Sequence, residues 1–169
     1  MKKVFIALLI IFSSTFLYSQ STIPKAQAMF LYNFCRLIEW PSHTRTGSFV
    51  IGVYGNSDIF YELETVIKGK HIGSQTALVR KFKSIDELSK CHVLFIPYKH
   101  TKEMETILSK VGSNSTLVLT EKPGAIEHGS AINYVIVGDK LKYEIAPENG
   151  KKKGLNISNK LVQMAYKVY

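Results

Sequence analysis

Cysteine is scarce in this 169-residue chain, and the short motifs of common enzyme classes are missing. No GxSxG, HExxH or CxxC motif occurs, and there is no glycine-rich phosphate-binding loop. The five histidines, His43, His71, His92, His100 and His128, include no pair at the spacing of metal ligands. We therefore expect a non-enzymatic protein without catalytic residues, metal or cofactor.

Long hydrophobic runs are lacking apart from the run at residues 4–12. Two lysines precede this run, and residues 13–20 are small and polar enough for a cleavage region. This order is typical of a secretory signal peptide, and the apolar run is short for a membrane span. We expect residues 1–20 to be cleaved on export to the periplasm, with a retained membrane anchor as the alternative. Residues 21–169 are then long enough for one domain with its own core.

Export bears on the two cysteines, because it permits a disulfide bond. Cys35 falls inside a predicted helix and Cys91 at the start of a predicted strand. Their separation in the sequence does not place the two Cα atoms within bridging distance. We expect both to be buried free thiols, with a Cys35–Cys91 bridge as the alternative.

Acidic residues are outnumbered, with 13 Asp and Glu against 22 Lys and Arg and a formal charge of +9. The excess is concentrated in residues 68–83 and 151–153. An exported protein rarely meets nucleic acid and no recognition motif is visible, so we expect no nucleic-acid partner. The remaining interpretations are a solvated basic surface, or attraction to an acidic partner or to anionic lipid headgroups.

The stretch that the fold should be built around is KAQAMFLYNFCRLIEWP, residues 25–41, which we predict to be one helix. Pro41 ends the helix and moves Trp40 out of the helical region. The polar seam of this helix is narrow, so the helix and Trp40 should be mostly buried. The alternative is a binding surface marked by four side chains of this stretch, Tyr32, Asn33, Arg36 and Trp40.

Strands and helices alternate along the next part of the chain. Apolar runs of strand length occur at residues 49–54, 76–82, 91–97 and 115–120, and helical patterns at 58–68, 84–89 and 101–111. Such alternation indicates a mainly parallel sheet with helices on both faces.

The pattern changes after residue 130. Two strands, 131–137 and 140–146, are separated by a Gly-Asp pair that signals a two-residue hairpin. A polar loop at 148–154 and a helix at 155–167 complete the predicted elements. The predicted fold is therefore α/β, a single three-layer domain with a mainly parallel sheet flanked by helices, a C-terminal β-hairpin and a closing helix.

Two predicted strand ends could receive a small ligand. Residues 55–58 follow the first strand and residues 97–101 follow the third, and ligands of open parallel sheets bind at such carboxyl ends. Residues 55–58 also open a helix N-terminus, which favours an anion. Fold class alone thus makes a small anionic ligand a candidate.

Leu155 and Ile157 are apolar residues that the predicted sheet and closing helix do not require. We expect them to be exposed near the helix start, where Glu144 and Lys151–Lys153 would rim them as in a protein interface. The alternative is that both pack under the helix as a hydrophobic staple.

Three segments in a fixed order carry a family resemblance. They are AMFLYNFCRLIEWP, then FVIGVYGNSDIFYEL leading to CHVLFIPY, then LKYEIAPENGKKKGLNISNKLVQMA. Together these segments resemble the YfiR family of bacterial periplasmic proteins over residues 25–166. The resemblance implies a non-enzymatic regulator in cyclic-di-GMP signalling, which restrains an inner-membrane diguanylate cyclase by binding its periplasmic part. Related domains are similar to input modules of sensor kinases.

The resemblance also implies roles for matched residues. The matched positions are Trp40, Pro41, Cys91, Glu144, Leu155, Ile157 and Ser158. We expect the first three to be structural and the last four to form the partner-binding surface. In the family, the cysteine matching Cys91 is similar to one half of a redox-sensitive disulfide with a partner upstream. This chain has no cysteine between residues 36 and 90, so the resemblance does not extend to that bond.

Two other functions compete with the regulator. One is a periplasmic small-molecule-binding domain of solute-receptor type, and the other is an exported hydrolase. For the oligomeric state, the sequence is compatible with a monomer and with a homodimer.

Overall fold

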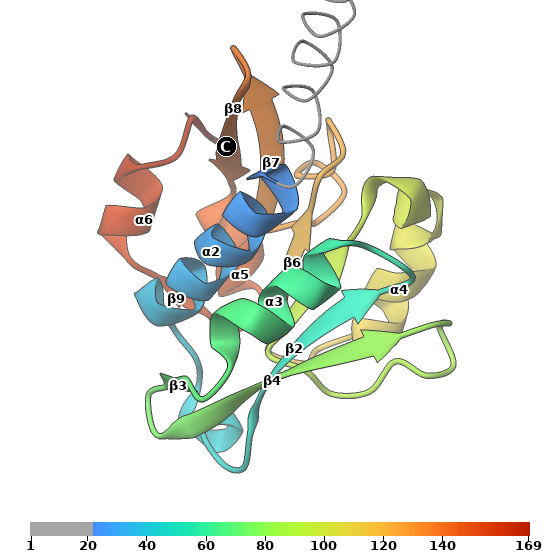
Figure 1. Ribbon diagram of the computed structural model, residues 1–169, viewed down its shortest axis with the longest axis vertical. Helices are drawn as coiled ribbons and strands as arrows, with labels where there is room; N and C mark the ends of the chain where they lie inside the picture. The colour runs from blue at the N-terminus through green and yellow to red at the C-terminus, as the bar shows by residue number, and fades with distance from the viewer. Residues whose placement is uncertain (1–21) are drawn as a thin grey trace, which may run out of the picture.

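The computed structural model describes residues 22–169 (Figure 1). The signal peptide predicted at residues 1–20 lies outside the described residues. The elements are α2 (Thr22–Leu37), β1 (Ile38–Glu39), η1 (Ser42–Thr44), β2 (Phe49–Tyr54), α3 (Ile59–Ile67), β3 (His71–Ile72), β4 (Gln75–Phe82), β5 (Val93–Ile96), η2 (Tyr98–Glu103), α4 (Met104–Val111), β6 (Leu117–Thr120), β7 (Ile132–Val137), β8 (Lys140–Ile145), α5 (Pro147–Lys151), β9 (Asn156–Ile157), α6 (Asn159–Gln163) and β10 (Lys167–Val168).

Within residues 22–169, one eight-stranded sheet has the order β10-β8-β7-β6-β5-β2-β4-β3. Pairing is parallel from β4 through β2, β5 and β6 to β7. β7 and β8 form an antiparallel hairpin, whose turn residues Gly138 and Asp139 both have positive φ, of 52° and 60°. Positive φ at both positions is the geometry that a two-residue hairpin turn needs. The predicted mainly parallel sheet with a C-terminal hairpin is confirmed.

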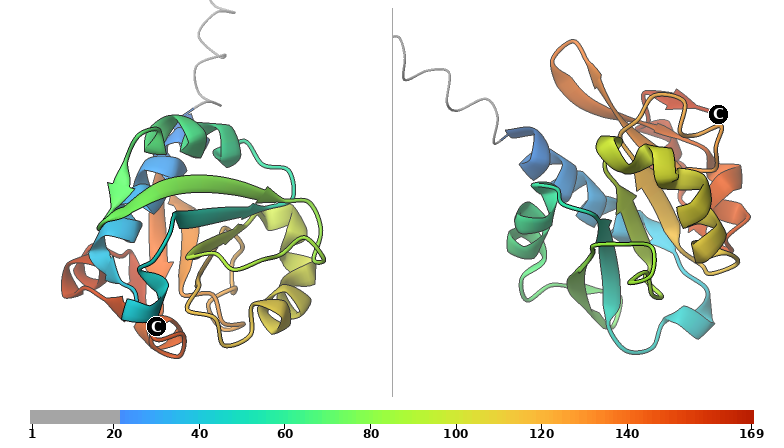
Figure 2. Two further views of the ribbon diagram at one scale, coloured as in Figure 1. Left: turned by 90° about the horizontal axis from the view of Figure 1, so that it is seen from below. Right: turned by 90° about the vertical axis from the view of Figure 1, so that its right-hand side faces the viewer.

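Helices cover both faces of this sheet (Figure 2). α2 and α3 pack on one face, over side chains that include Ile51 of β2 and Val93 of β5. α4 packs on the other face, over Leu94 of β5 and Val118 of β6. Because successive residues of a strand point to opposite faces, the run VLFI of β5 is buried on both sides. The three-layer α/β prediction is confirmed.

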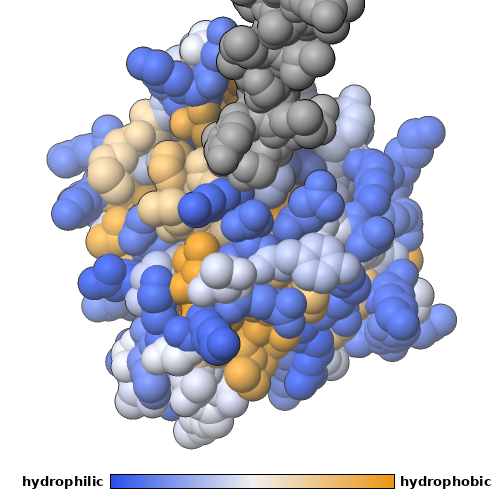
Figure 3. All heavy atoms as spheres, viewed as in Figure 1, coloured by the Kyte–Doolittle hydropathy of each residue, from blue (hydrophilic) through white to orange (hydrophobic). Residues whose placement is uncertain are grey.

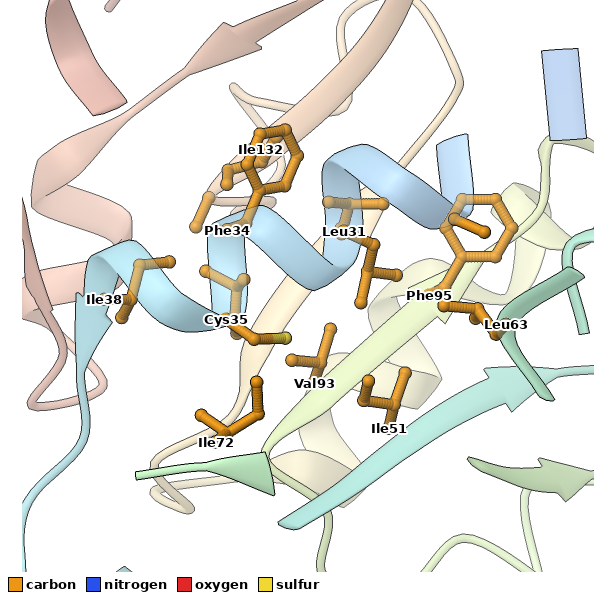
Figure 4. Packing of buried hydrophobic residues seen from close by; sticks show 14 of the residues in the cluster. Leu31, Phe34, Cys35, Ile38, Ile51, Leu63, Ile72, Val93, Phe95 and Ile132 are labelled. Atoms are coloured by element: carbon orange, nitrogen blue, oxygen red, sulfur yellow. The ribbon is translucent and has the colours of Figure 1, made fainter. Parts of the chain in front are cut away.

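α2 lies across the centre of the larger core, as its apolar sequence predicts (Figure 4). Leu31, Phe34 and Cys35 recur at helical spacing and are at most 3% exposed. Figure 4 shows Leu31 and Cys35 directed from the helix toward the strands beneath it. The helix also has a solvent face that the sequence pattern underestimated, since Met29 is 50% exposed.

Trp40 lies in the core, 5% exposed, as predicted, but the helix ends before it. α2 stops at Leu37, and the next two residues form β1, which pairs antiparallel with β9. Trp40 precedes Pro41, and a residue before proline favours an extended backbone over a helical one. The extended conformation begins already at β1. The Trp40 ring packs edge-on against Phe49, with ring centroids 4.9 Å apart, and its Nε1 donates to the His92 carbonyl at 3.3 Å.

The closing helix predicted at residues 155–167 is confirmed only over Asn159–Gln163, and its predicted bounds are wrong. β9, the short helix α6 and β10 occupy that stretch (Figure 1). The Tyr166 N–H donates to the Tyr143 carbonyl at 2.8 Å and the Tyr169 N–H to the Ile145 carbonyl at 2.9 Å. These hydrogen bonds pair the Tyr143–Ile145 part of the outer edge of β8, which would otherwise have no partner strand, so this segment is extended rather than helical.

Two smaller predictions also need correction. The helix predicted at residues 84–89 is a single turn at residues 85–87, and the loop predicted at 148–154 includes all of α5 except Pro147. Pro147 is the first residue of α5, where its missing N–H costs no hydrogen bond and its fixed φ suits a first turn.

Candidate functional site

An apolar groove of about 350 Å³ lies between α2, β8 and the segment that follows α6. Its floor consists of aromatic side chains that include Phe34 of α2 and Tyr143 of β8. Met164 and Tyr166 form its outer wall and are 52% and 53% exposed. Figure 3 shows apolar atoms gathered over α2 and the α6 end of the chain, within a mostly hydrophilic surface.

One face of α2 contributes side chains to the floor of the groove because they recur at helical spacing. Phe30, Phe34 and Leu37 are four and three residues apart, so they lie on one face of the helix. The Phe34 ring lies 4.8 Å from that of Tyr143 at an interplanar angle of 62°, and the Phe30 ring lies 6.3 Å from it at 87°. These are edge-to-face arrangements, which aromatic rings favour over a face-to-face stack. The floor is therefore a packed surface of aromatic rings.

Tyr143 connects the floor to the outer wall. Its hydroxyl donates to the Leu161 carbonyl at 2.6 Å, and burial raises its pKa to about 12. The phenol therefore stays protonated and holds α6 beside β8. The Lys142 ammonium lies 5.1 Å from the Tyr166 ring, so a cation borders the apolar wall.

The sequence did not identify this groove. The sequence pattern places its α2 residues in a buried core helix and its C-terminal residues in a closing helix. One signal was available: residues 164–169 contain four large apolar or aromatic side chains, Met164, Tyr166, Val168 and Tyr169. All four are exposed in the structure.

Glu144, a predicted partner-binding residue, takes part in a hydrogen-bond network within the chain. Its carboxylate accepts from Asn133 Nδ2 at 3.2 Å and from the Tyr169 hydroxyl at 3.3 Å. Asn133 is fully buried, and its Oδ1 accepts from Thr120 Oγ1 at 2.8 Å. Glu144 thus joins a buried polar cluster of the sheet to the last residue of the chain.

The other three predicted partner-binding residues, Leu155, Ile157 and Ser158, lie in the segment before α6 and connect that helix to the rest of the fold. Leu155 is 4% exposed, so the expectation that it is a spare, exposed residue is wrong. Its N–H donates to the Gly150 carbonyl, which turns the side chain into the core rather than out of the lysine-rich segment. This burial matches the alternative, in which the residue packs under the fold.

Ile157 and Ser158 join the same segment to β1 and to the end of α2. Ile157 is half-buried, opposite Ile38 in the β1–β9 pair, and a Cβ on Gly150 would lie 2.7 Å from its Cδ1. The Ser158 N–H donates to the Leu37 carbonyl at 3.1 Å, and its hydroxyl accepts from the Leu161 N–H at 3.4 Å as the cap of α6. These contacts are structural, and contact with a partner stays a prediction for Glu144, Ile157 and Ser158.

Cys35 and Cys91 are both buried and unpaired within the part of the chain that the structure describes, as predicted. They lie on opposite faces of the sheet, one in the α2 core and one in the α4 core. Burial raises the pKa of Cys91 to about 12 and that of Cys35 further. Neither thiol is poised as a nucleophile.

The two predicted strand ends do meet, at Gly55 and His100. Gly55 has φ of +68°, and a Cβ there would overlap the His100 imidazole. His100 Nδ1 lies 2.9 Å from a Glu103 oxygen, and the other Glu103 oxygen accepts from the Tyr54 hydroxyl at 2.7 Å. The hydrogen bonds from Tyr54 and His100 lower the pKa of Glu103. An imidazole and a carboxylate thus fill this strand end, and an anionic ligand there stays a prediction.

Residues 22–169 contain no group of three His, Cys, Asp or Glu side chains that could hold a metal ion. Among the helices described, none has the length and apolar character needed to cross a bilayer.

A family comparison identifies the chain. The sequence profile of the family described as DUF4154, YfiR/HmsC-like, matches residues 24–166. The chain belongs to the YfiR/HmsC-like family. This is a family of periplasmic, non-catalytic regulators, which confirms the predicted resemblance at that level. No curated protein matches the YfiR/HmsC-like chain significantly.

Solved structures share the fold of this YfiR/HmsC-like protein. One is the ABC domain in complex with L-Trp from Streptococcus pneumonia, with a TM-score of 0.51 and 14% identity over 71% of this chain and 55% of that one. Another is a conserved domain protein from Vibrio cholerae O1 biovar El Tor, with a TM-score of 0.61 and 9% identity over 87% of this chain and 60% of that one. The chain thus spans less than two thirds of either protein, and at these identities the likeness is one of fold.

Proposed function

We propose that this YfiR/HmsC-like protein is exported to the periplasm and restrains an inner-membrane signalling protein, a diguanylate cyclase or a sensor kinase, by binding its periplasmic part. Membership of a family of periplasmic, non-catalytic regulators supports this proposal. The observation that carries it is the apolar groove, because a concave surface with an aromatic floor is where binding energy between proteins concentrates.

The groove also defines the chemistry of the segment that it receives. Aromatic and aliphatic walls accept the apolar face of an amphipathic helix, which anchors in such grooves through residues one turn apart. Lys142, which lines the groove, is an exposed cation beside the Tyr166 ring. We expect acidic residues on the flank of the partner segment.

Capture of the partner from detergent-solubilised membranes tests the proposal. Met164→Glu places a charge in the groove wall, whereas Met29→Glu places the same charge on α2 at a residue that does not line the groove. The two methionines are almost equally exposed, at 52% and 50%, so neither change should unfold the protein. We expect the Met164→Glu protein to lose its membrane partner and the Met29→Glu protein to retain it.

Equal capture by both variants would contradict the groove as the contact site. Failure of the wild-type protein to capture any inner-membrane signalling protein would contradict the function itself. Export is tested separately by N-terminal sequencing of the periplasmic protein, which should begin near Gln20.

The second candidate function is small-molecule binding. A volume of about 350 Å³ suits a small organic ligand, and aromatic walls with one amide, that of Asn33, are typical of such pockets. Native mass spectrometry of the purified protein would detect a co-purified ligand. If the Met164→Glu protein lost the co-purified ligand but still captured the membrane partner as the wild-type protein does, small-molecule binding would be favoured as the function of the groove.

A further inference from the structure

β4 has an outer edge that is open along the second half of the strand. The strand runs over eight residues, but β3 pairs only with Gln75 and Thr76 at its start. On the inner side, β2 pairs with β4 from Ala77 to Phe82. Figure 1 shows β4 as the outermost long strand, with β3 beside one end of it.

Hydrogen bonds at the two ends of β4 establish which backbone groups point outward. The Ala77 N–H donates away from β2, to the Lys70 carbonyl at 3.0 Å. The Phe82 carbonyl points inward and accepts from the Gly55 N–H at 2.8 Å. Because successive residues of a strand alternate in direction, the N–H and C=O groups of Val79 and Lys81 face outward.

The outward groups of Val79 and Lys81 have no hydrogen-bond partner within residues 22–169. The Lys83 N–H, next in this row, donates to Glu87 Oε2 at 2.8 Å and closes the open segment. The free edge is thus a short ladder with defined ends, long enough to pair with a few residues of an extended chain.

The charged side chains of the segment that forms this edge are all basic, and the Glu87 carboxylate lies beyond its end at Lys83. Residues 68–83 contain five basic side chains and no acidic one: Lys68, Lys70, Arg80, Lys81 and Lys83. Arg80 is exposed on the α4 face of the strand, beside Leu78, which is 45% exposed. The Lys81 ammonium lies on the other face, 4.5 Å from the Phe60 ring.

Charge decides what can pair with such an edge. A second copy of the chain would set its own lysines and arginines opposite these, and like charges across a strand pair are destabilising. An acidic strand would instead meet opposite charges on both faces while its backbone completes the ladder.

We propose that the β4 edge binds an extended, acidic segment of a partner protein, which adds to the sheet as a further strand beside Val79 and Lys81. This surface is distinct from the groove, since β4 and β8 lie toward opposite edges of the sheet. The proposal therefore goes beyond the proposed function and stands or falls independently of it.

Fluorescence anisotropy with a labelled heptapeptide, in which glutamates alternate with valines, tests the proposal on the purified protein. Two further peptides carry N-methyl groups on one or the other set of alternate amides. Strand addition uses only one set, so we expect one methylated peptide to lose binding and the other to retain it. A peptide with lysine in place of glutamate should not bind.

Protein variants supply the second arm. Val79→Pro removes an outward N–H at an edge position where proline is tolerated, and should weaken binding about tenfold. Arg80→Gln should weaken binding and reduce its salt dependence, whereas Lys152→Gln, which removes an equal charge at the exposed end of α5, should change neither. Circular dichroism confirms the fold of each variant.

Three results would overturn the proposal. They are absence of binding by the acidic peptide, equal binding or equal loss of binding by the two methylated peptides, and equal effects of Arg80→Gln and Lys152→Gln. The methylated peptides are tested on the wild-type protein, so they decide the question even if Val79→Pro does not fold.

Discussion

The Tyr143 hydroxyl donates to the Leu161 carbonyl at 2.6 Å, and this hydrogen bond joins the β7–β8 hairpin to α6. Tyr143 is 5% exposed and Leu161 is fully buried, so neither group can turn to water instead. The bond fixes the position of α6 and thereby the outer wall of the groove.

Tyr143→Phe should destabilise the protein by about 1–3 kcal/mol, because it leaves a buried carbonyl without a donor while preserving the ring contacts. Urea unfolding followed by circular dichroism measures the loss. Tyr61→Phe is the matched control: Tyr61 is 58% exposed, and its hydroxyl should contribute less than about 0.5 kcal/mol. Equal midpoints for the Tyr143→Phe and wild-type proteins would mean that this bond does not hold α6.

Trp40→Ala should cost about 3–5 kcal/mol, because it leaves a cavity beside Phe49 and removes the donor to the His92 carbonyl. Guanidinium unfolding of this variant, compared with Tyr98→Ala, provides the measurement. Tyr98 is 61% exposed, so its truncation should shift the midpoint little. A Trp40→Ala midpoint as high as that of Tyr98→Ala would show that Trp40 is not a core residue.

The sheet could be predicted from the sequence because its strands are buried on both faces. Runs such as FVIGVY and VLFI are continuous and apolar, and that pattern has one explanation in an alternating βα chain. The Gly138–Asp139 turn likewise needs only local chemistry. These elements depend on residues close together in the sequence.

The C-terminal part could not be predicted, because its structure depends on distant residues. The segment around Leu161 has helical spacing, but β8 leaves an edge that residues 166–169 satisfy as a strand. Leu155 likewise has no predicted packing partner in the sequence. Its burial depends on the hydrogen bond from its N–H to the Gly150 carbonyl. The groove forms only when these segments pack against α2 and β8. The sequence pattern of any one segment therefore could not predict it.

Gly55→Ala should destabilise the protein by about 1–3 kcal/mol, because a non-glycine residue at φ of +68° is strained and the new methyl group would displace the His100 ring from Glu103. Thermal melts of Gly55→Ala, His100→Ala and the double variant form a cycle. Since the overlap disappears once the ring is gone, the double variant should be more stable than the sum of the single changes predicts. Strict additivity would contradict the close packing of Gly55 and His100.

Cys35 and Cys91 should both be free thiols that react slowly in the folded protein. Alkylation under native conditions should leave both unlabelled, and alkylation in denaturant without reductant should label both. Intact-mass spectrometry distinguishes these states, since burial shields the thiols and the raised pKa values keep the reactive thiolate rare. An unlabelled species in denaturant, two hydrogens lighter, would show a Cys35–Cys91 bridge.

His92 should make the stability of the protein fall as the pH is lowered from about 7.5 to about 5.5. Its Nδ1 accepts from the Val50 N–H at 3.1 Å, which requires that nitrogen to be unprotonated, so Nε2 carries the hydrogen and donates to the Thr44 carbonyl at 2.9 Å. A proton on Nδ1 would face the Val50 N–H, and burial lowers the pKa of His92 below its usual 6.5.

The unfolded chain therefore binds this proton at a higher pH than the folded protein does, and the stability contributed by neutral His92 is lost progressively as the pH falls below about 6.5. Urea midpoints measured at both pH values test this expectation for the wild-type, His92→Gln and His128→Gln proteins. Removing His92 should flatten the pH dependence, whereas removing the exposed His128 should leave it intact. If His92→Gln retains the wild-type slope, another group is responsible and the tautomer inferred for His92 is wrong.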